Sequence, residues 1–149
     1  MMNVKRVYLD NCCFNRPFDD QGSIRIRLEA EAKLYIQKKV MSKDLEIIWS
    51  YILEYENNAN PFEERRSAIS EWKKHAVEEI LETSDLISKA REIQERRHLK
   101  PKDCLHVACA IQGDCDYFLT TDDEIIKKMN GFEEIIVNDP QTFLREVEI

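Results

Sequence analysis

Short apolar runs alternate along the chain with longer segments in which apolar side chains recur every three or four residues. The short runs favour strands, and they span residues 5–10, 45–49, 116–119 and 132–137. The longer segments have the helical period, and they span residues 23–40, 50–59, 62–80, 84–97, 101–111 and 123–129, with a last helix from Asp139. This alternation predicts an α/β fold of three layers (α/β/α) with a mainly parallel central sheet, in a single domain over residues 1–149.

Capping residues and turn formers refine these boundaries. Ser23 and Ser50 each precede a helical segment, where a serine hydroxyl can accept a hydrogen bond from the first turn. Residues 11–22 are rich in Asn, Asp, Pro and Gly, so we expect a loop between the first strand and the first long helix. The apolar positions of that helix include Ile24, Leu28, Leu34 and Ile36.

The net charge of −7 comes from the last third of the chain. Residues 1–60 and 61–100 each hold nine acids and nine bases, whereas residues 101–149 hold eleven acids and four bases. Such an excess aids solubility. It also predicts a local negative field that would need a cation before a phosphate could approach. The sequence shows no sign of the broadly basic face that is typical of nucleic-acid-binding domains.

The apolar runs are too short to cross a bilayer. The first residues contain no apolar stretch of signal-peptide length before Asp10. We therefore expect a cytoplasmic protein that has no membrane partner.

The chain has five cysteines, of which Cys12 and Cys13 are adjacent. An odd number is poor evidence for a disulfide framework, and no Cys/His spacing suits zinc. We expect reduced thiols, some of them buried as small apolar groups. Cys12 and Cys13 follow Asp10 closely, but the sequence indicates no histidine that would activate them.

Four acidic residues occupy positions where a strand end or a helix start would direct a carboxylate towards one place. Asp10 ends the first strand, and Asp122 follows the strand at 116–119. Glu56 lies within two helical turns of the strand that ends near Trp49, and Asp103 lies in the first turn of its helix. In parallel α/β sheets, ligands bind at the carboxyl ends of the strands. A cluster of carboxylates there predicts a site for Mg²⁺ or Mn²⁺.

The surroundings of these acids resemble the motifs of the PIN-domain family of metal-dependent nucleases, which includes the VapC-like toxins of toxin–antitoxin pairs. The resemblance rests on four stretches in the family's order: Val7–Asn11, Ser50–Glu56, Lys102–Ala110 and Phe118–Asp122. It implies a PIN-like fold, metal ligation by Asp10, Glu56, Asp103 and Asp122, and Mg²⁺- or Mn²⁺-dependent cleavage of RNA. It also implies a cognate antitoxin and a homodimer as candidate partners.

Several neighbours of the four acids leave alternatives open. Glu54 and Glu56 lie about 200° apart around a helix, so only one can face the site, and the serine spacing favours Glu56. Asp123 could replace Asp122 or cap the next helix. His106 lies one turn after Asp103, where a core position is more expected than a metal-binding one. Four residues could hydrogen-bond to the metal ligands or serve only as caps and turn residues: Ser50, Thr120, Thr121 and Asp123.

Basic residues near the predicted site are candidates for RNA contacts. Arg16 lies on the loop after the first strand, Arg25 lies at the next helix start, and Lys102 precedes Asp103. The plainer interpretation, a solvated surface charge, is favoured for each. Phe14 and Phe18 could stack on bases, although buried anchors of the loop are more expected.

Two other classes of protein fit the sequence less well. Haloacid-dehalogenase-type phosphatases carry a second acid two positions after the first aspartate, where this chain has Cys12. A dinucleotide-binding fold needs a glycine-rich loop, and this chain has three scattered glycines. The strongest alternative to a nuclease is a PIN-like binding or scaffold module that has little or no catalytic activity.

Overall fold

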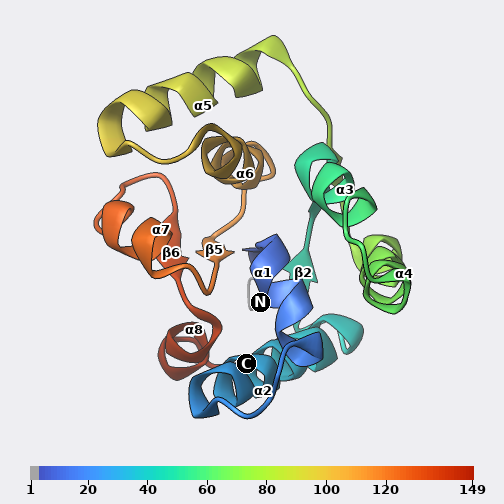
Figure 1. Ribbon diagram of the computed structural model, residues 1–149. Helices are drawn as coiled ribbons and strands as arrows, with labels where there is room; N and C mark the ends of the chain where they lie inside the picture. Colours follow the sequence, from blue (N-terminus) through green and yellow to red (C-terminus); the bar gives the residue numbers. More distant parts are fainter. Residues whose placement is uncertain (1–3) are drawn as a thin grey trace.

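A four-stranded sheet lies at the centre of the computed structural model, which describes residues 4–149 (Figure 1). The strand order is β2-β1-β5-β6, and every neighbouring pair is parallel. Val7, Tyr8 and Leu9 of β1 are at most 1% exposed, as expected for a strand covered on both faces. The strands are β1 (Lys5–Leu9), β2 (Leu45–Ile47), β5 (Tyr117–Leu119) and β6 (Ile136–Asn138).

Helices cover both faces of this sheet and confirm the predicted three-layer α/β architecture. In Figure 1, α5 and α6 lie on one side of the strands, and α2 and α8 lie on the other. No helix within residues 4–149 has both the length and the hydropathy that a membrane span requires. The main helices are α2 (Ile24–Met41), α3 (Tyr51–Asn58), α5 (Ser84–Arg97), α6 (Pro101–Gln112), α7 (Asp123–Lys128) and α8 (Pro140–Glu146).

The prediction of one helix over residues 62–80 is wrong. The segment forms α4 (Glu63–Glu71), a 3-10 helix η2 (Trp72–His75) and the short strand β4 (Glu79–Ile80). β4 pairs in parallel with β3 (Trp49–Ser50), which continues the chain after β2. The backbone N–H of Val77 donates to the carbonyl of Ile47 at 2.9 Å, so this part of the chain exchanges helical hydrogen bonds for strand pairing.

Two further boundaries differ from the sequence predictions. Residues 11–22 are not a plain loop, because they contain α1 (Asn11–Asn15) and a 3-10 helix η1 (Arg16–Phe18). The Asp10 carboxylate accepts the backbone N–H of Asn11 and caps α1, so the helix begins directly after β1. The last strand begins at Ile136, since residues 133–135 form bends that follow the left-handed Gly131.

Helix α2 buries several charged and polar side chains, and of the four apolar positions named from the sequence only Ile36 is buried. Ile24, Leu28 and Leu34 are 74%, 47% and 50% exposed. Glu29 is buried because Arg16 and Arg25 both pair with its carboxylate, at 3.0 Å and 3.5 Å. The ion pair with Arg16 of η1 therefore allows the face of α2 that carries Glu29 to point inward. The buried side of α2 consists of Glu29, Ala30, Ala32, Lys33, Ile36, Gln37 and Val40.

Lys33 lies in this interface between two aromatic rings. Its ammonium nitrogen is 5.3 Å from the centroid of Phe14 and 5.9 Å from that of Trp72. Among the described residues, no carboxylate lies within ion-pairing distance of this nitrogen. Burial lowers the pKa of Lys33 to about 7, because the ammonium loses its hydration in the interior and the neutral amine is favoured. The cation–π contacts offset only part of that cost.

We predict that Lys33→Met stabilises the protein at pH 7 and below. The unfolded lysine stays protonated up to about pH 10.4, whereas the folded one loses its proton near pH 7. Burying the charge therefore destabilises the fold by its full amount below pH 7 and by progressively less between pH 7 and about 10.4. The gain should be on the order of 2–4 kcal/mol at pH 6 and should shrink towards pH 10. Urea unfolding across this pH range measures it. The exposed Lys38→Met on the same helix is the control, and an equal gain in both variants would contradict this account.

Candidate active site

Asp10 lies where the carboxyl ends of β1 and β5 meet. Because Leu9 pairs with Leu119, Asp10 lies beside the residues that follow β5. One carboxylate oxygen of Asp10, Oδ1, accepts the N–H of Asn11 at 2.8 Å, and Oδ2 accepts the Thr120 hydroxyl at 2.8 Å. Asp10 is buried, and these two donors fix the orientation of its carboxylate.

Glu56 and His106 reach Asp10 from two helices that pack against each other, α3 and α6. The Nε2 atom of His106 hydrogen-bonds to Oε1 of Glu56 and lies 3.9 Å from Oδ1 of Asp10. One ligand atom from each of the three side chains lies within 4.8 Å of the others. Two carboxylates and one imidazole at this spacing could hold a metal ion.

A buried hydrogen-bond chain holds His106 from behind. Its Nδ1 atom lies 2.6 Å from the Tyr8 hydroxyl, which lies 2.7 Å from the Ser50 hydroxyl. The Ser50 oxygen also accepts the N–H of Leu53 at 3.1 Å and so caps α3. Burial raises the pKa of Tyr8 well above its usual range, so its hydroxyl stays protonated.

Neither Tyr8 nor the contact of His106 with Glu56 follows from the sequence patterns. Tyr8 has the appearance of an ordinary core residue of the first strand. The available signal was its hydroxyl, since a buried tyrosine oxygen needs a hydrogen-bond partner. Ser50 is connected to the acids only indirectly: it caps the helix that carries Glu56, and it hydrogen-bonds to Tyr8.

Asp103 lies in the first turn of α6, one turn before His106. Burial raises its pKa to about 6, and the negative charge of Asp10 is the next cause. His106 acts in the opposite direction, and the charges of Asp122 and Glu56 raise the pKa further. Asp103 therefore experiences the charges of the other three predicted acids.

Asp122 caps the short helix α7 at the exposed edge of this group. Its Oδ1 accepts the N–H of Glu124 at 2.9 Å and that of Ile125 at 3.4 Å. The adjacent Asp123 points elsewhere, because both of its oxygens accept from Arg25, at 2.7 Å and 2.9 Å. This geometry favours Asp122 over Asp123 as the fourth acid.

Glu54 and Glu56 point to different sides of α3, as residues two positions apart on a helix do. Glu54 accepts the indole N–H of Trp49 at 2.8 Å and lies 3.6 Å from the ammonium of Lys73. Glu56 faces His106 instead. Glu54 is therefore occupied by structural contacts away from the site.

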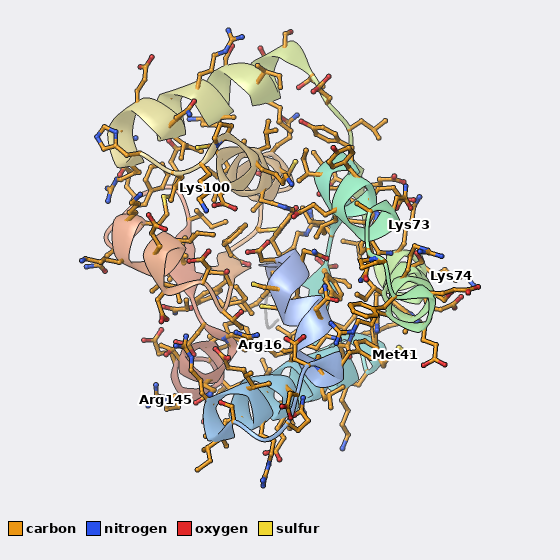
Figure 2. The ribbon with its side chains drawn as sticks, in the orientation of Figure 1. Arg16, Met41, Lys73, Lys74, Lys100 and Arg145 are labelled. Carbon is orange, nitrogen blue, oxygen red and sulfur yellow. The ribbon has the colours of Figure 1, made fainter. Side chains whose placement is uncertain are left out.

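Two of the three predicted RNA-contacting residues are engaged in ion pairs. Arg16 lies where α1 approaches α2 (Figure 2) and pairs with Asp19 and Glu29, at 2.9 Å and 3.0 Å. Arg25 pairs with Asp123 and also donates to the backbone carbonyl of the buried Thr121 at 3.3 Å. Lys102 is exposed, with its ammonium 5.7 Å from the Tyr55 ring centroid.

The cysteines are free thiols among the described residues, and four of the five are buried. Cys12 is partly exposed and lies beside the site, with its sulfur 3.5 Å from Oδ2 of Asp10 and 3.4 Å from the Thr120 hydroxyl. Cys13 points inward and contacts the carbonyl of Leu119. The backbone N–H of Thr121 also donates to the Cys12 sulfur, at 3.3 Å. None of these three partners is a cationic group of the kind that activates a cysteine.

We predict that Asp103→Asn stabilises the metal-free protein at pH 7.5. The raised pKa means that ionised Asp103 disfavours the fold at pH 7.5, and this cost disappears as the pH falls through 6 towards 4. Thermal melting in EDTA should show a higher Tm by a few degrees at pH 7.5, where about 1 kcal/mol shifts Tm by roughly 2–4 °C, and a smaller gain at pH 4.5. Asp123→Asn should raise Tm at neither pH, because Arg25 lowers the pKa of Asp123. A pH-independent gain for Asp103→Asn would contradict the electrostatic cause.

Comparison with known proteins identifies the family. Among curated protein sequences, none matches the chain. Among solved structures, the crystal structure of VapBC2 from Rickettsia felis bound to a DNA fragment from their promoter contains a similar chain, with 14% identity and a TM-score of 0.56. The match covers 89% of this chain and 98% of that chain, and at such low identity it concerns the fold alone. The family model described as PIN domain matches residues 7–131, so the chain belongs to the PIN-domain family.

Proposed function

We propose that the protein is a Mg²⁺- or Mn²⁺-dependent endoribonuclease that hydrolyses RNA phosphodiester bonds. The observation that carries this proposal is the convergence of Asp10, Glu56 and His106, with Asp103 beside them, at the carboxyl edge of a PIN-domain sheet. Ligand sites of parallel α/β sheets lie at this edge.

The donor atoms of the site fit a divalent cation. Asp10, Glu56 and Asp103 would hold it, with Asp122 binding directly or through water. Carboxylate oxygens are the ligands preferred by Mg²⁺ and Mn²⁺. When bound, such an ion would make an attacking water more acidic and neutralise charge on the leaving oxygen.

The surrounding residues hold the carboxylates in place. Thr120 donates to Asp10 and fixes the plane of its carboxylate, while Ser50 anchors the start of the helix that carries Glu56. In a two-metal or one-metal site, such supporting contacts fix the direction from which the ligands approach. Thr121 supports the site less directly, through its backbone. Its N–H donates to the Cys12 sulfur, and its carbonyl accepts a hydrogen bond from Arg25.

RNA would approach at the exposed rim of the site. Lys102 precedes Asp103 and is exposed, so its ammonium is the best placed of the predicted cations to meet a phosphate. The Tyr55 ring beside it is 65% exposed and could stack on a base. Arg16 and Arg25 would have to exchange their present ion pairs to contact RNA, so their contribution should be smaller.

We further propose that the protein acts in the cytoplasm as the toxin of a toxin–antitoxin pair. The similar solved structure is, by its description, VapBC2 on promoter DNA, and VapC-like toxins are the PIN-domain class that the motifs resemble. An antitoxin protein would then be the cognate partner, and a homodimer would be the second assembly to test. Nuclease activity does not depend on this biological role.

The nuclease proposal predicts metal-dependent cleavage that requires Asp10. Purified protein should cleave single-stranded or looped RNA with Mn²⁺ or Mg²⁺ and lose activity in EDTA. Asp10→Asn should reduce the rate by more than about 100-fold. Removing a residue that only supports a metal ligand costs up to about 100-fold, and the loss of a ligand itself should cost more. Glu54→Gln is the matched control, because it makes the same chemical change on α3 away from the site. Mn²⁺ binding without cleavage of any RNA would favour the scaffold alternative.

The toxin proposal predicts growth arrest on expression. Induction of the wild-type chain in bacteria should stop growth, measured as optical density and viable count, whereas Asp10→Asn at the same expression level should not. Equal growth of both strains, with RNA cleavage retained by the purified wild type, would reject the toxin role and leave the nuclease role standing.

A further inference from the structure

We infer that the Tyr8–Ser50 hydrogen-bond chain positions His106 as a nitrogen ligand of the proposed metal site, and that this imidazole makes the site select Mn²⁺ over Mg²⁺. The inference rests on the proposed function, because it concerns the same metal site. It adds a residue to the four acids and distinguishes between the two ions that the acids alone would accept.

The ring of His106 is fixed with one nitrogen towards the carboxylates. His106 is 1% exposed, and its ring packs edge-on against Tyr8 at a centroid distance of 5.6 Å. Tyr8 in turn stacks on Phe118 at 5.2 Å. Since Nδ1 faces the Tyr8 hydroxyl, Nε2 is the nitrogen that faces Glu56 and Asp10.

With Nε2 protonated, the hydrogen bonds of the chain all run in one direction. The Nε2–H group donates to Glu56, and the Tyr8 hydroxyl donates to Nδ1. The Ser50 hydroxyl donates to the Tyr8 oxygen and accepts the N–H of Leu53. Every buried polar group in the chain then has a partner, and His106 holds Glu56 in place.

With the proton on Nδ1 instead, the hydrogen bonds that join His106, Tyr8 and Ser50 run in the opposite direction. Nδ1–H donates to the Tyr8 oxygen, and the Tyr8 hydroxyl donates to Ser50, whose oxygen also accepts the N–H of Leu53. This neutral imidazole has the same number of protons, but its Nε2 lone pair is free to bind a cation between Asp10 and Glu56. A hydroxyl at residue 8 permits both states because it can donate and accept, which a phenyl ring cannot.

An imidazole changes which ion the site prefers. Mg²⁺ favours oxygen ligands and retains its waters, whereas imidazole nitrogen suits first-row transition ions. Metal-binding histidines also gain orientation and basicity when their second ring nitrogen donates to a fixed acceptor, here the Tyr8 oxygen. Two carboxylates with one oriented imidazole therefore favour Mn²⁺ among the two proposed ions.

Pulsed electron paramagnetic resonance of the Mn²⁺-loaded wild type tests the nitrogen ligand directly. We expect ¹⁴N modulation from a coordinated imidazole. It should disappear in His106→Gln, because glutamine has no ring nitrogen and can place an amide oxygen near the former position of Nε2. Absence of ¹⁴N modulation in the wild type would overturn the inference even if RNA cleavage by Mn²⁺ is normal. If no Mn²⁺ binds in an Asp10-dependent manner, the proposed function fails as well.

Calorimetric titration with Mn²⁺ and Mg²⁺ tests the selectivity. The ratio of Mn²⁺ to Mg²⁺ affinity should fall about 10-fold in His106→Gln and by a similar factor in Tyr8→Phe, within the range found when the partner of a metal-binding histidine is removed. Tyr117→Phe on β5 is the matched control, because Tyr117 contacts Phe143 and lies outside the hydrogen-bond chain. An unchanged ratio in a folded Tyr8→Phe variant, checked by thermal melting, would show that the chain does not set metal preference.

Discussion

The parallel pairing of β1 with β5 holds together the two parts of the chain on which the site depends. Leu9 and Leu119 are partners in this pairing, and the N–H of Asp10 continues it by donating to the carbonyl of Leu119 at 2.9 Å. Asp10 and Thr120 are thereby brought into hydrogen-bond contact across 110 positions of sequence. The helices then add Glu56, Asp103 and His106 around a carboxylate whose position the sheet has already fixed.

That arrangement opposes the stability of the metal-free protein. Burial at the sheet edge raises the pKa of Asp103, and the negative charges of Asp10, Asp122 and Glu56 raise it further. Hydrogen bonds from Asn11, Thr120 and His106 offset part of the cost. The fold therefore accepts unfavourable electrostatics at this edge, and the buried hydrophobic residues of β1 and β5 provide the compensation.

The sequence predicted the features that depend on local order and failed for those that depend on long-range contacts. Strand ends followed by an acid, and serines at helix starts, are local signals, so Asp10, Ser23 and Ser50 were placed correctly. The buried side of α2 did not follow from the sequence, because the periodicity of its apolar residues carries no information about Arg16, which reaches Glu29 from η1. β4 was missed for the same reason, since its partner β3 lies 30 positions earlier in the chain.

The unequal burial of the five thiols has a practical consequence for covalent chemistry. Four sulfurs are enclosed in the core, whereas Cys12 is partly open beside Asp10 and Thr120. An alkylating reagent or an oxidant would thus meet Cys12 first, and any group attached there would occupy space next to the carboxylate. The same sulfur that packs the site in the reduced protein makes it a natural attachment point for a probe and a point of vulnerability during handling in air.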